Sequence, residues 1–349
     1  MSLLKMTSQT TPTKYWNDSC ELKGLDYALG NNCVGATTNP IIVKSVIENN
    51  LAIYEETIIE ILKKNPTMTE DELTWYMIEK LAKDGAKKLE PIFNSKTGEG
   101  RISIQTNTKY CKSPDLLIEQ ALYFSTLAPN IQVKIPVTAA GVKAIEEVTY
   151  QGVSINATVC FTVPQAVAVA EAVERALAKR ESEGKDNSEI NPVCTIMIGR
   201  TDDYIKKVVN SQMALIDPEA MDWAGIACAK NYYRLFKERN YKTKLLTAAF
   251  RNLHHWTALV GGDLLATIPT PFQKRIDASN ITIDSRIDEP VNESWLNQLK
   301  TLPEFVKAYE PDGMKVEEFD HYGAVIDTLT QFYQGYDELV IIMRKYILR

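Results

Sequence analysis

The sequence contains few of the residues that form disulfide frameworks or hold metal ions. Its 349 residues include six cysteines and three histidines. The cysteines are scattered without a Cys-x-x-Cys pair, which favours free thiols in a reducing cytoplasm over a disulfide framework. Two of the histidines, His254 and His255, are adjacent and cannot share one face of a helix. We therefore expect a cytoplasmic protein without a metal site.

Long apolar runs and an excess of positive charge are also absent. No stretch approaches the ~20 apolar residues of a membrane span, and the first residues contain no signal-peptide core. The net charge is −6 and the pI is near 5.4. This charge argues against nucleic acid or an anionic membrane as the main partner, although local basic residues can still bind a small anion. The sequence leaves a homo-oligomer open.

The chain does contain an alternation of short β-rich runs with longer helical patterns. Several of these runs are continuously apolar, as expected for strands that helices cover on both faces. The eight predicted strands are Lys14–Asn17, Cys33–Thr37, Arg101–Thr106, Gln132–Val137, Ser154–Phe161, Val193–Ile198, Lys244–Ala249 and Leu264–Ile268. Eight strands alternating with helices predict an α/β fold, a (β/α)8 TIM barrel that forms a single domain over residues 1–349.

Three segments exceed the minimal plan of a barrel. Residues 44–100 predict a helical insertion between the second and third strands, and Glu181–Asn191 predicts an exposed polar loop. Residues 290–349 predict C-terminal helices that pack on the barrel. The last of them, Asp320–Leu348, has an apolar face rich in Tyr and Phe. We interpret this face as core packing against the barrel, and a lid over the active site is the alternative.

One predicted strand carries a charge where a charge is least expected. The run Ile131–Val137 is typical of a strand buried on both faces, yet Lys134 lies at its centre. Lysine is almost never fully buried without a partner or a function. Because desolvation penalises the ammonium, burial lowers the pKa of an amine, and a neutral amine can form a Schiff base with a carbonyl substrate. The alternative is an edge strand whose lysine points to water.

Polar side chains recur near the ends of the other predicted strands, where a barrel places its chemistry. They are Asp18, Thr38, Asn39, Gln105, Asn156, Thr158, Arg200 and Arg251. Three of them have simpler structural explanations. Asp18 is a possible N-cap of a helix that begins near Ser19, and Asn39 fits an Asn-Pro turn. Arg200 is close in sequence to Asp202 and Asp203, which suggests a surface ion pair.

Five motifs in order make the chain resemble the transaldolase family. They are Gly35-Ala-Thr-Thr-Asn-Pro40, Val133-Lys-Ile-Pro136, Gly152-Val-Ser-Ile-Asn-Ala-Thr158, Ile198-Gly-Arg200 and Ala248-Ala-Phe-Arg-Asn252. The matched part runs from about residue 14 to residue 270. The resemblance implies a class I, Schiff-base-forming aldolase of the pentose phosphate pathway that needs no cofactor. Such an enzyme transfers a dihydroxyacetone unit from a ketose phosphate, such as fructose 6-phosphate, to an aldehyde.

The resemblance also implies a role for each matched residue. Lys134 corresponds to the Schiff-base lysine and Asp18 to the aspartate that acts as acid and base. Thr158 corresponds to the threonine that orients a catalytic water, which Gln105 also holds. Substrate contacts are expected from Thr38, Asn39, Asn156, Thr195, Arg200 and Arg251. The two arginines of this set correspond to those that grip the terminal phosphate of the sugar.

Three departures mark the chain as a divergent member. Gln105 stands where typical transaldolases have a glutamate, and it resembles the fructose-6-phosphate aldolase branch instead. That branch has a tyrosine near the sixth strand, where this chain has Met197. Ala249 replaces a serine that helps bind phosphate, although Thr195 offers a hydroxyl nearby. These differences leave three alternatives open: an aldolase, a transaldolase specific for a sulfosugar, and a non-catalytic barrel that binds a phosphosugar.

Overall fold

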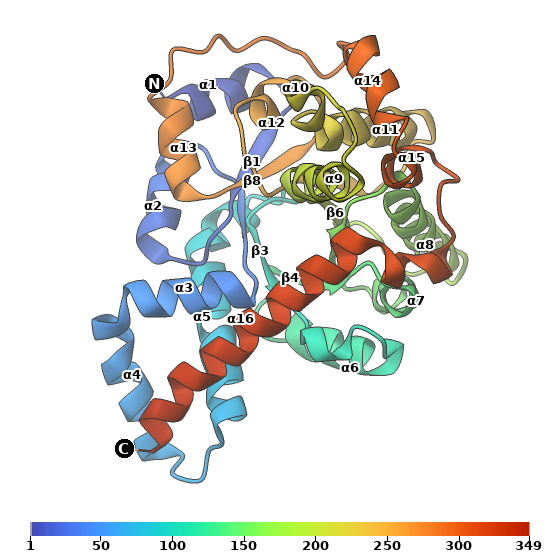
Figure 1. Ribbon diagram of the computed structural model, residues 1–349. Coiled ribbons are helices and arrows are strands. Elements are labelled where there is room, and N and C mark those ends of the chain that lie inside the picture. The colour runs from blue at the N-terminus through green and yellow to red at the C-terminus, as the bar shows by residue number, and fades with distance from the viewer. Residues whose placement is uncertain (1, 349) are drawn as a thin grey trace.

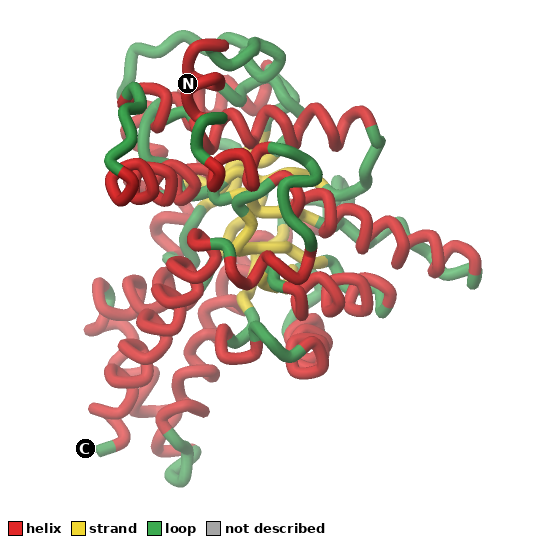
Figure 2. The backbone as a smooth tube through the Cα atoms, turned by 45° about the vertical axis from the view of Figure 1, so that its right-hand side comes forward, coloured by secondary structure: helices red, strands yellow, loops and turns green. Residues whose placement is uncertain are grey.

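Eight parallel strands close into a barrel, neighbour to neighbour in chain order, in the computed structural model, which describes residues 2–348. They are β1 (Lys14–Asn17), β2 (Gly35–Thr37), β3 (Arg101–Gln105), β4 (Ile131–Pro136), β5 (Ile155–Cys160), β6 (Val193–Ile196), β7 (Lys244–Thr247) and β8 (Leu265–Ile268). Figure 2 shows the strands in yellow at the centre of a ring of helices. All eight predicted strands are present, and the predicted (β/α)8 barrel is confirmed.

Three of the helices around the barrel begin at hydroxyl caps. Ser113, Thr138 and Thr162 each accept a hydrogen bond from the backbone N–H three residues ahead, at the start of α6, α7 and α8. These helices and their neighbours are α1 (Leu3–Thr10), α2 (Leu22–Gly30), α6 (Pro114–Ser125), α7 (Ala139–Tyr150), α8 (Val163–Ser182), α9 (Ile198–Gln212), α10 (Pro218–Met221), α11 (Ala224–Glu238), α12 (His254–Thr257) and α13 (Thr270–Asp277). Within the described residues, no helix has the length and apolar character needed to cross a membrane.

A second group of helices extends away from the barrel. Between β2 and β3 lie α3 (Pro40–Asn49), α4 (Leu51–Lys64) and α5 (Glu70–Phe93), and the short η1 (Thr108–Tyr110) follows β3. The chain ends with α14 (Glu293–Leu299), α15 (Pro303–Tyr309), η2 (Val316–His321) and α16 (Gly323–Ile347). In Figure 1, α16 runs from the barrel down to α3, α4 and α5, against which it packs. Whether these segments act as an insertion and an extension of one domain stays a prediction.

The aromatic face of α16 is buried, as predicted, but its partner is only partly the barrel. Phe332 and Tyr336 are 0% and 3% exposed. The Tyr336 ring lies 5.6 Å from the ring of Trp75 on α5, so this end of α16 packs on the helices that follow β2. The Phe332 end instead lies beside α9 and β5. One helix therefore both packs in a core and crosses the barrel near the ends of its strands.

An apolar plug fills the amino-terminal end of the barrel. It consists of Trp16, Val193, Leu246 and Leu265, all of which are buried. A Cβ atom at Gly35 would lie 2.5 Å from the Trp16 ring, so only glycine fits on β2 at this level. The plug leaves the polar interior residues at the carboxyl-terminal half of the barrel, which is the end that carries the chemistry of this fold.

Candidate active site

Lys134 lies at the centre of the barrel with almost no exposed surface. It is 2% exposed, and its Nζ donates one hydrogen bond, to the carbonyl of Thr38 at 3.4 Å. Burial lowers the pKa of Lys134 to about 8, and the positive charge of Arg200 acts in the same direction, while Asp18 opposes both. The alternative of an edge-strand lysine in water is therefore wrong. Near neutral pH, an appreciable fraction of this amine is unprotonated.

Asp18 follows β1 and points toward the same interior. Its Oδ1 accepts a hydrogen bond from the Thr37 hydroxyl at 2.7 Å, and Thr37 lies 2.6 Å from the hydroxyl of Thr267. Burial raises the pKa of Asp18, although the charge of Lys134 and the Thr37 bond act against this rise. The helix that follows begins at Leu22. Asp18 is therefore not the N-cap that the alternative interpretation required, and its carboxyl faces the ammonium.

The neighbours of Lys134 across the sheet are both amides. Gln105 on β3 and Asn156 on β5 are its direct partners in the parallel ladder, so all three side chains point into the barrel. The Asn156 amide donates to Ser103 at 2.9 Å and accepts from the Thr195 hydroxyl at 2.6 Å. Thr195 thus belongs to a fully buried chain beside the lysine, and its hydroxyl proton is already engaged.

Two buried polar atoms next to the lysine have no partner within the described structure. They are Oε1 of Gln105 and Oγ1 of Thr158. Thr158 pairs in the ladder with Pro136, which lies two residues beyond Lys134 on the same strand. The residue after Thr158 is Val159, whose φ is 56°. A β-branched residue in the left-handed region is strained, and such strain clusters at functional sites. The two free acceptors can bind a water molecule or a substrate hydroxyl.

Arg200 and Arg251 approach each other at the carboxyl-terminal rim. Burial and the charge of Arg251 lower the pKa of Arg200, which indicates that the two guanidinium groups are close. Arg251 is held by Asp203 through its Nε and Nη2 atoms, at 3.0 and 2.8 Å. The ion pair suggested for Arg200 is therefore wrong, because Asp203 binds Arg251 instead of Arg200. Two adjacent cations with one carboxylate leave room for an anion.

Two structural features that sequence reasoning missed fix these arginines. A Cβ atom at Gly199 would lie 1.8 Å from the carbonyl oxygen of Ala249, so α9 approaches the end of β7 through a glycine. The buried His255 accepts the backbone N–H of Arg251 at Nδ1, 3.0 Å away, and its Nε2 lies 2.6 Å from Asp202. The adjacent histidine pair was visible in the sequence, but its contact with Asp202 depends on the packing of α9 and α12.

The last helix also reaches the site. The Arg200 Nη1 atom donates to Gln331 on α16 at 2.6 Å and contacts the Thr328 hydroxyl at 3.4 Å. The Cζ atom of the same guanidinium lies over the Phe332 ring, 5.7 Å from the centroid of that ring. The sequence offered no motif for Gln331, because the resemblance ended well before α16.

The remaining two predicted residues are engaged in local structure. Asn39 is the N-cap of α3 and accepts the backbone N–H of Ile42 at 3.0 Å, so the predicted Asn-Pro turn opens a helix. Thr38 supplies its carbonyl to Lys134 and directs its hydroxyl to the sulfur of Cys20 at 3.6 Å. Thr38 thus contacts the lysine through its carbonyl, and substrate contacts of both residues remain predictions.

The site has the donors of an organic reaction centre rather than those of a metal centre. In residues 2–348, no group of three or more His, Cys, Asp or Glu side chains is placed to hold a metal ion. The six cysteines are unpaired and buried. The chemistry that this arrangement offers is that of an amine, a carboxyl, uncharged amides and two guanidinium groups.

A barrel with this set of residues defines a class of protein, and comparison with known families agrees. The sequence profile described as Transaldolase/Fructose-6-phosphate aldolase matches residues 15–321. The chain therefore belongs to this family. The match extends beyond the motifs, which ended near residue 270, and it includes α14, α15 and η2.

Individual relatives are more distant. Transaldolase 2 of Streptomyces avermitilis is 30% identical over 210 residues, which cover 58% of this chain and 55% of that protein. Transaldolase 1 of Streptomyces coelicolor is 31% identical over 179 residues, or 50% of this chain and 46% of the relative. A longer match, to the transaldolase of Trichodesmium erythraeum, is 25% identical over 305 residues and 78% of each chain. The matches to the two Streptomyces proteins thus span about half of those relatives.

Proposed function

We propose that the protein is a transaldolase, which transfers a dihydroxyacetone unit from a ketose phosphate to an aldehyde through a Schiff base at Lys134. The observation that carries the proposal is a buried lysine whose pKa is lowered to about 8, beside a carboxyl group. A neutral amine attacks the ketose carbonyl, and loss of water leaves an iminium that withdraws electrons from the neighbouring carbon–carbon bond. The names of the relatives support this class of reaction.

Asp18 is the proposed acid and base of the cleavage step. Its raised pKa suits a carboxyl group that must both accept and return a proton during the cycle. As the carbon–carbon bond breaks, Asp18 takes the proton of the adjacent hydroxyl, the aldehyde leaves, and the electron pair remains on Lys134 as an enamine. The enamine then attacks the acceptor aldehyde, whose oxygen receives the proton from Asp18. Hydrolysis of the new iminium releases the product ketose.

The water of Schiff-base formation and hydrolysis has a proposed place between Gln105 and Thr158. Both residues present a buried oxygen without a partner in the described structure. A glutamine orients water by hydrogen bonds but does not take its proton, so the proton transfers of the cycle fall to Asp18. Asn156, held by Ser103 and Thr195, steadies the lysine from the other side.

Arg200 and Arg251 are the proposed ligands of the anionic end of the sugar. Asp203 binds Arg251, and Arg200 turns one nitrogen toward Gln331. Planar guanidinium groups suit phosphate and other tetrahedral oxyanions. Since the residue at 249 is alanine and Thr195 is engaged with Asn156, a sulfonate remains an alternative to phosphate. A donor screen with fructose 6-phosphate and its sulfonate analogue distinguishes the two.

Borohydride trapping tests the Schiff base. We expect fructose 6-phosphate and borohydride to add one reduced dihydroxyacetone unit to the intact protein, at the peptide that contains Lys134. Lys134→Ala should abolish both the adduct and turnover. Lys230→Met is a matched control, because Lys230 also has a pKa lowered to about 8 but donates to the backbone carbonyls of Ile287 and Glu289. An adduct that survives Lys134→Ala contradicts the proposal, and the absence of any adduct favours a phosphosugar-binding barrel.

An aldolase is the second candidate, and Gln105 is the observation that favours it. In that case a proton, rather than an aldehyde, captures the enamine, and free dihydroxyacetone is released. A cytoplasmic location, which the unpaired cysteines favour, belongs to the same proposal. So do small sugar phosphates as its partners and a possible homo-oligomer.

A further inference from the structure

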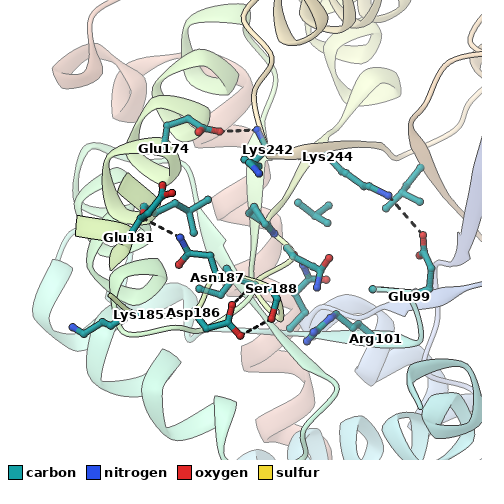
Figure 3. Close-up of a pocket in the computed structure, with 18 of the residues that line it drawn as sticks. Glu99, Arg101, Glu174, Glu181, Lys185, Asp186, Asn187, Ser188, Lys242 and Lys244 are labelled. Carbon is teal, nitrogen blue, oxygen red and sulfur yellow. Dashed lines mark hydrogen bonds and ion pairs between the residues drawn. The ribbon is translucent and has the colours of Figure 1, made fainter. Parts of the chain in front are cut away.

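A cavity of about 620 Å³ opens at the amino-terminal end of the barrel, opposite the candidate active site (Figure 3). Its walls come from the first residues of several strands and from the loop between α8 and β6. Trp16, Val193 and Leu265 line the cavity and belong to the apolar plug. The plug separates the cavity from the polar interior around Lys134, so a molecule in it would not reach the lysine.

Arg101, the first residue of β3, is the most unusual side chain in this cavity. It is 4% exposed, and burial lowers its pKa, although a guanidinium stays charged near neutral pH. Its Nη2 donates to the carbonyl of Glu189 at 3.0 Å, and its guanidinium lies 5.0 Å from the centroid of the Phe93 ring. Its Nε is buried without a hydrogen-bond partner in the described structure. A buried guanidinium that makes no ion pair within residues 2–348 is costly unless an anion joins it.

Two lysines share a single buried carboxylate near Arg101. Glu99 is 5% exposed and lies 3.8 Å from both Lys14 and Lys244. Burial raises the pKa of Glu99, and the two lysines act to lower it. The negative charges of Glu189 and Glu99 also act on Arg101, but within residues 2–348 neither carboxylate forms an ion pair with its guanidinium. The unpartnered Nε atom of Arg101 therefore calls for an acceptor from a ligand, and an anionic group suits a guanidinium best.

Two other acidic residues of the cavity are engaged in hydrogen bonds of their own. Asp186 uses both oxygens to accept from Ser188, from its backbone N–H and from its hydroxyl. Glu174 accepts from the backbone N–H of Lys242 at 2.6 Å. Figure 3 shows Glu174 joined to Lys242 and Asp186 joined to Ser188. These hydrogen bonds occupy both carboxylates.

Gln132, the second residue of β4, adds a hydrogen-bond acceptor to the cavity that Arg101 lines. It is 0% exposed, and its Nε2 donates to the carbonyls of Ile155 and Asn191 at 2.9 and 2.6 Å. These bonds fix the amide, yet its Oε1 is buried without a partner in the part of the chain that the structure describes. An acceptor beside a cationic guanidinium calls for a ligand that brings its own donor, such as a hydroxyl group.

We propose that this cavity, which we call the amino-end site, binds a small oxyanion that also carries a hydroxyl group. The anionic group contacts Arg101 and Lys244, and the hydroxyl donates to Gln132. Two classes of metabolite share this chemistry, sugar phosphates and hydroxycarboxylates. The proposal is independent of the reaction at Lys134, because the plug lies between the two sites.

Titration calorimetry tests the amino-end site. The parent is the full chain with Arg200→Ala and Arg251→Ala, which removes the cationic rim at the other end of the barrel. We expect glycerol 3-phosphate or citrate to bind this parent at one site per chain, and neutral glycerol not to bind. Tricarballylate, which lacks the hydroxyl of citrate, should bind more weakly than citrate. Tighter binding of glycerol 3-phosphate identifies the ligand as a sugar phosphate, and tighter binding of citrate identifies a hydroxycarboxylate.

Variants of the parent locate the binding. Arg101→Met should weaken binding by roughly 10- to 150-fold, the range for a lost hydrogen bond to a charged group. Lys244→Met should weaken binding by a smaller factor. Because Lys244 is an exposed side chain, this variant should fold, and it tests the proposal if Arg101→Met does not fold. Lys64→Met, on the distant helix α4, is the matched control and should bind as the parent does. The proposal is overturned if neither anion binds at millimolar concentration, or if every folded cavity variant binds like Lys64→Met.

Discussion

Lys134 is a buried amine whose surroundings hold its proton weakly. Its Nζ donates a single bond of 3.4 Å, and in residues 2–348 no carboxylate forms an ion pair with it. The neighbouring charges act in opposite directions, because Asp18 favours the ammonium and Arg200 disfavours it. Residues that serve the donor sugar in the proposed reaction therefore also set the protonation of the nucleophile.

The pH dependence of adduct formation should report this balance. We expect the rate of Schiff-base formation to rise with pH around a midpoint near 8, because only the neutral amine attacks. Asp18→Asn removes a negative charge that favours the ammonium, so the midpoint should fall. Arg200→Met removes a positive charge, so the midpoint should rise. Rapid mixing with donor followed by borohydride quenching at each pH measures the rate. Midpoints that coincide in all three proteins would show that neither charge acts on Lys134.

The same pKa predicts that the lysine costs stability. A folded-state pKa of about 8, below the ordinary 10.5, means that the folded protein penalises the ammonium fully below pH 8 and not at all above about pH 10.5. Lys134→Met should therefore raise the free energy of unfolding by up to about 3 kcal/mol at pH 7, and the gain should shrink as pH rises from 8 to 10. Denaturant unfolding at several pH values measures it. A loss of stability at pH 7 would mean that packing around the lysine, rather than charge, dominates.

Only those residues of the candidate site could be predicted from the sequence whose place depends on a single strand. Lys134, Asp18 and Gln105 follow from the position of each side chain in its own strand, and the barrel brings them together. The bonds of Asp202 to His255 and of Asp203 to Arg251 could not be predicted. They join elements far apart in the chain, and no sequence pattern sets the register between those elements.

At the scale of elements, glycines decide how closely helices approach the strand ends. Gly199 is the second residue of α9. A Cβ atom at this position would lie 1.8 Å from the Ala249 carbonyl oxygen and 2.8 Å from the Cγ atom of Arg251. A second glycine, Gly225, lets α11 approach the carbonyl of Ile198 in the same way. The strand-to-helix connections after β6 and β7 are thus fitted to each other through backbone contacts.

Gly199→Ala should disturb the paired arginines more than the lysine. The added methyl group must push the end of β7 away from α9, which separates Arg251 from Arg200. We expect KM for fructose 6-phosphate to rise by roughly 10-fold or more, as for a weakened charge-assisted contact. Neutral dihydroxyacetone as donor should be affected much less. Gly30→Ala is the control, because a Cβ atom there meets nothing within 4 Å. Equal losses with both donors would place the effect on the catalytic residues instead.

Element prediction succeeded where local pattern suffices and failed where partners are distant. All eight strands were found because buried parallel strands are short apolar runs bounded by polar ends. For α16, the sequence showed that one face is apolar but not which surface would cover it. The structure divides that face between Trp75 on α5, which contacts Tyr336, and the guanidinium of Arg200, which contacts Phe332. Amphipathicity specifies a buried face but not its partner.

At the scale of the molecule, α16 links the helices that follow β2 to the rim of the barrel. Tyr336 donates to Asp71, and Arg344 bonds Glu70, so the far end of α16 is tied to the start of α5. Its near end holds Arg200 through Gln331. In the proposed reaction, we expect a helix fixed at both ends across the rim to limit the access of water to the enamine. Exclusion of water favours capture of the enamine by an aldehyde over its protonation.

This arrangement predicts transfer rather than release, against the suggestion of Gln105. Cleavage of fructose 6-phosphate by the wild type should depend strongly on an acceptor aldehyde, and little free dihydroxyacetone should form without one. Tyr336→Ala loosens α16 at its far end and should raise the acceptor-independent release several-fold while the borohydride adduct still forms at Lys134. Phe305→Ala, which truncates another buried aromatic ring on α15, is the matched control for lost stability and should not change the ratio. Enzymatic assay of free dihydroxyacetone with and without acceptor measures both rates. If the wild type releases it equally fast in either case, the protein is an aldolase, and the amide at position 105 outweighs the helix that covers the rim.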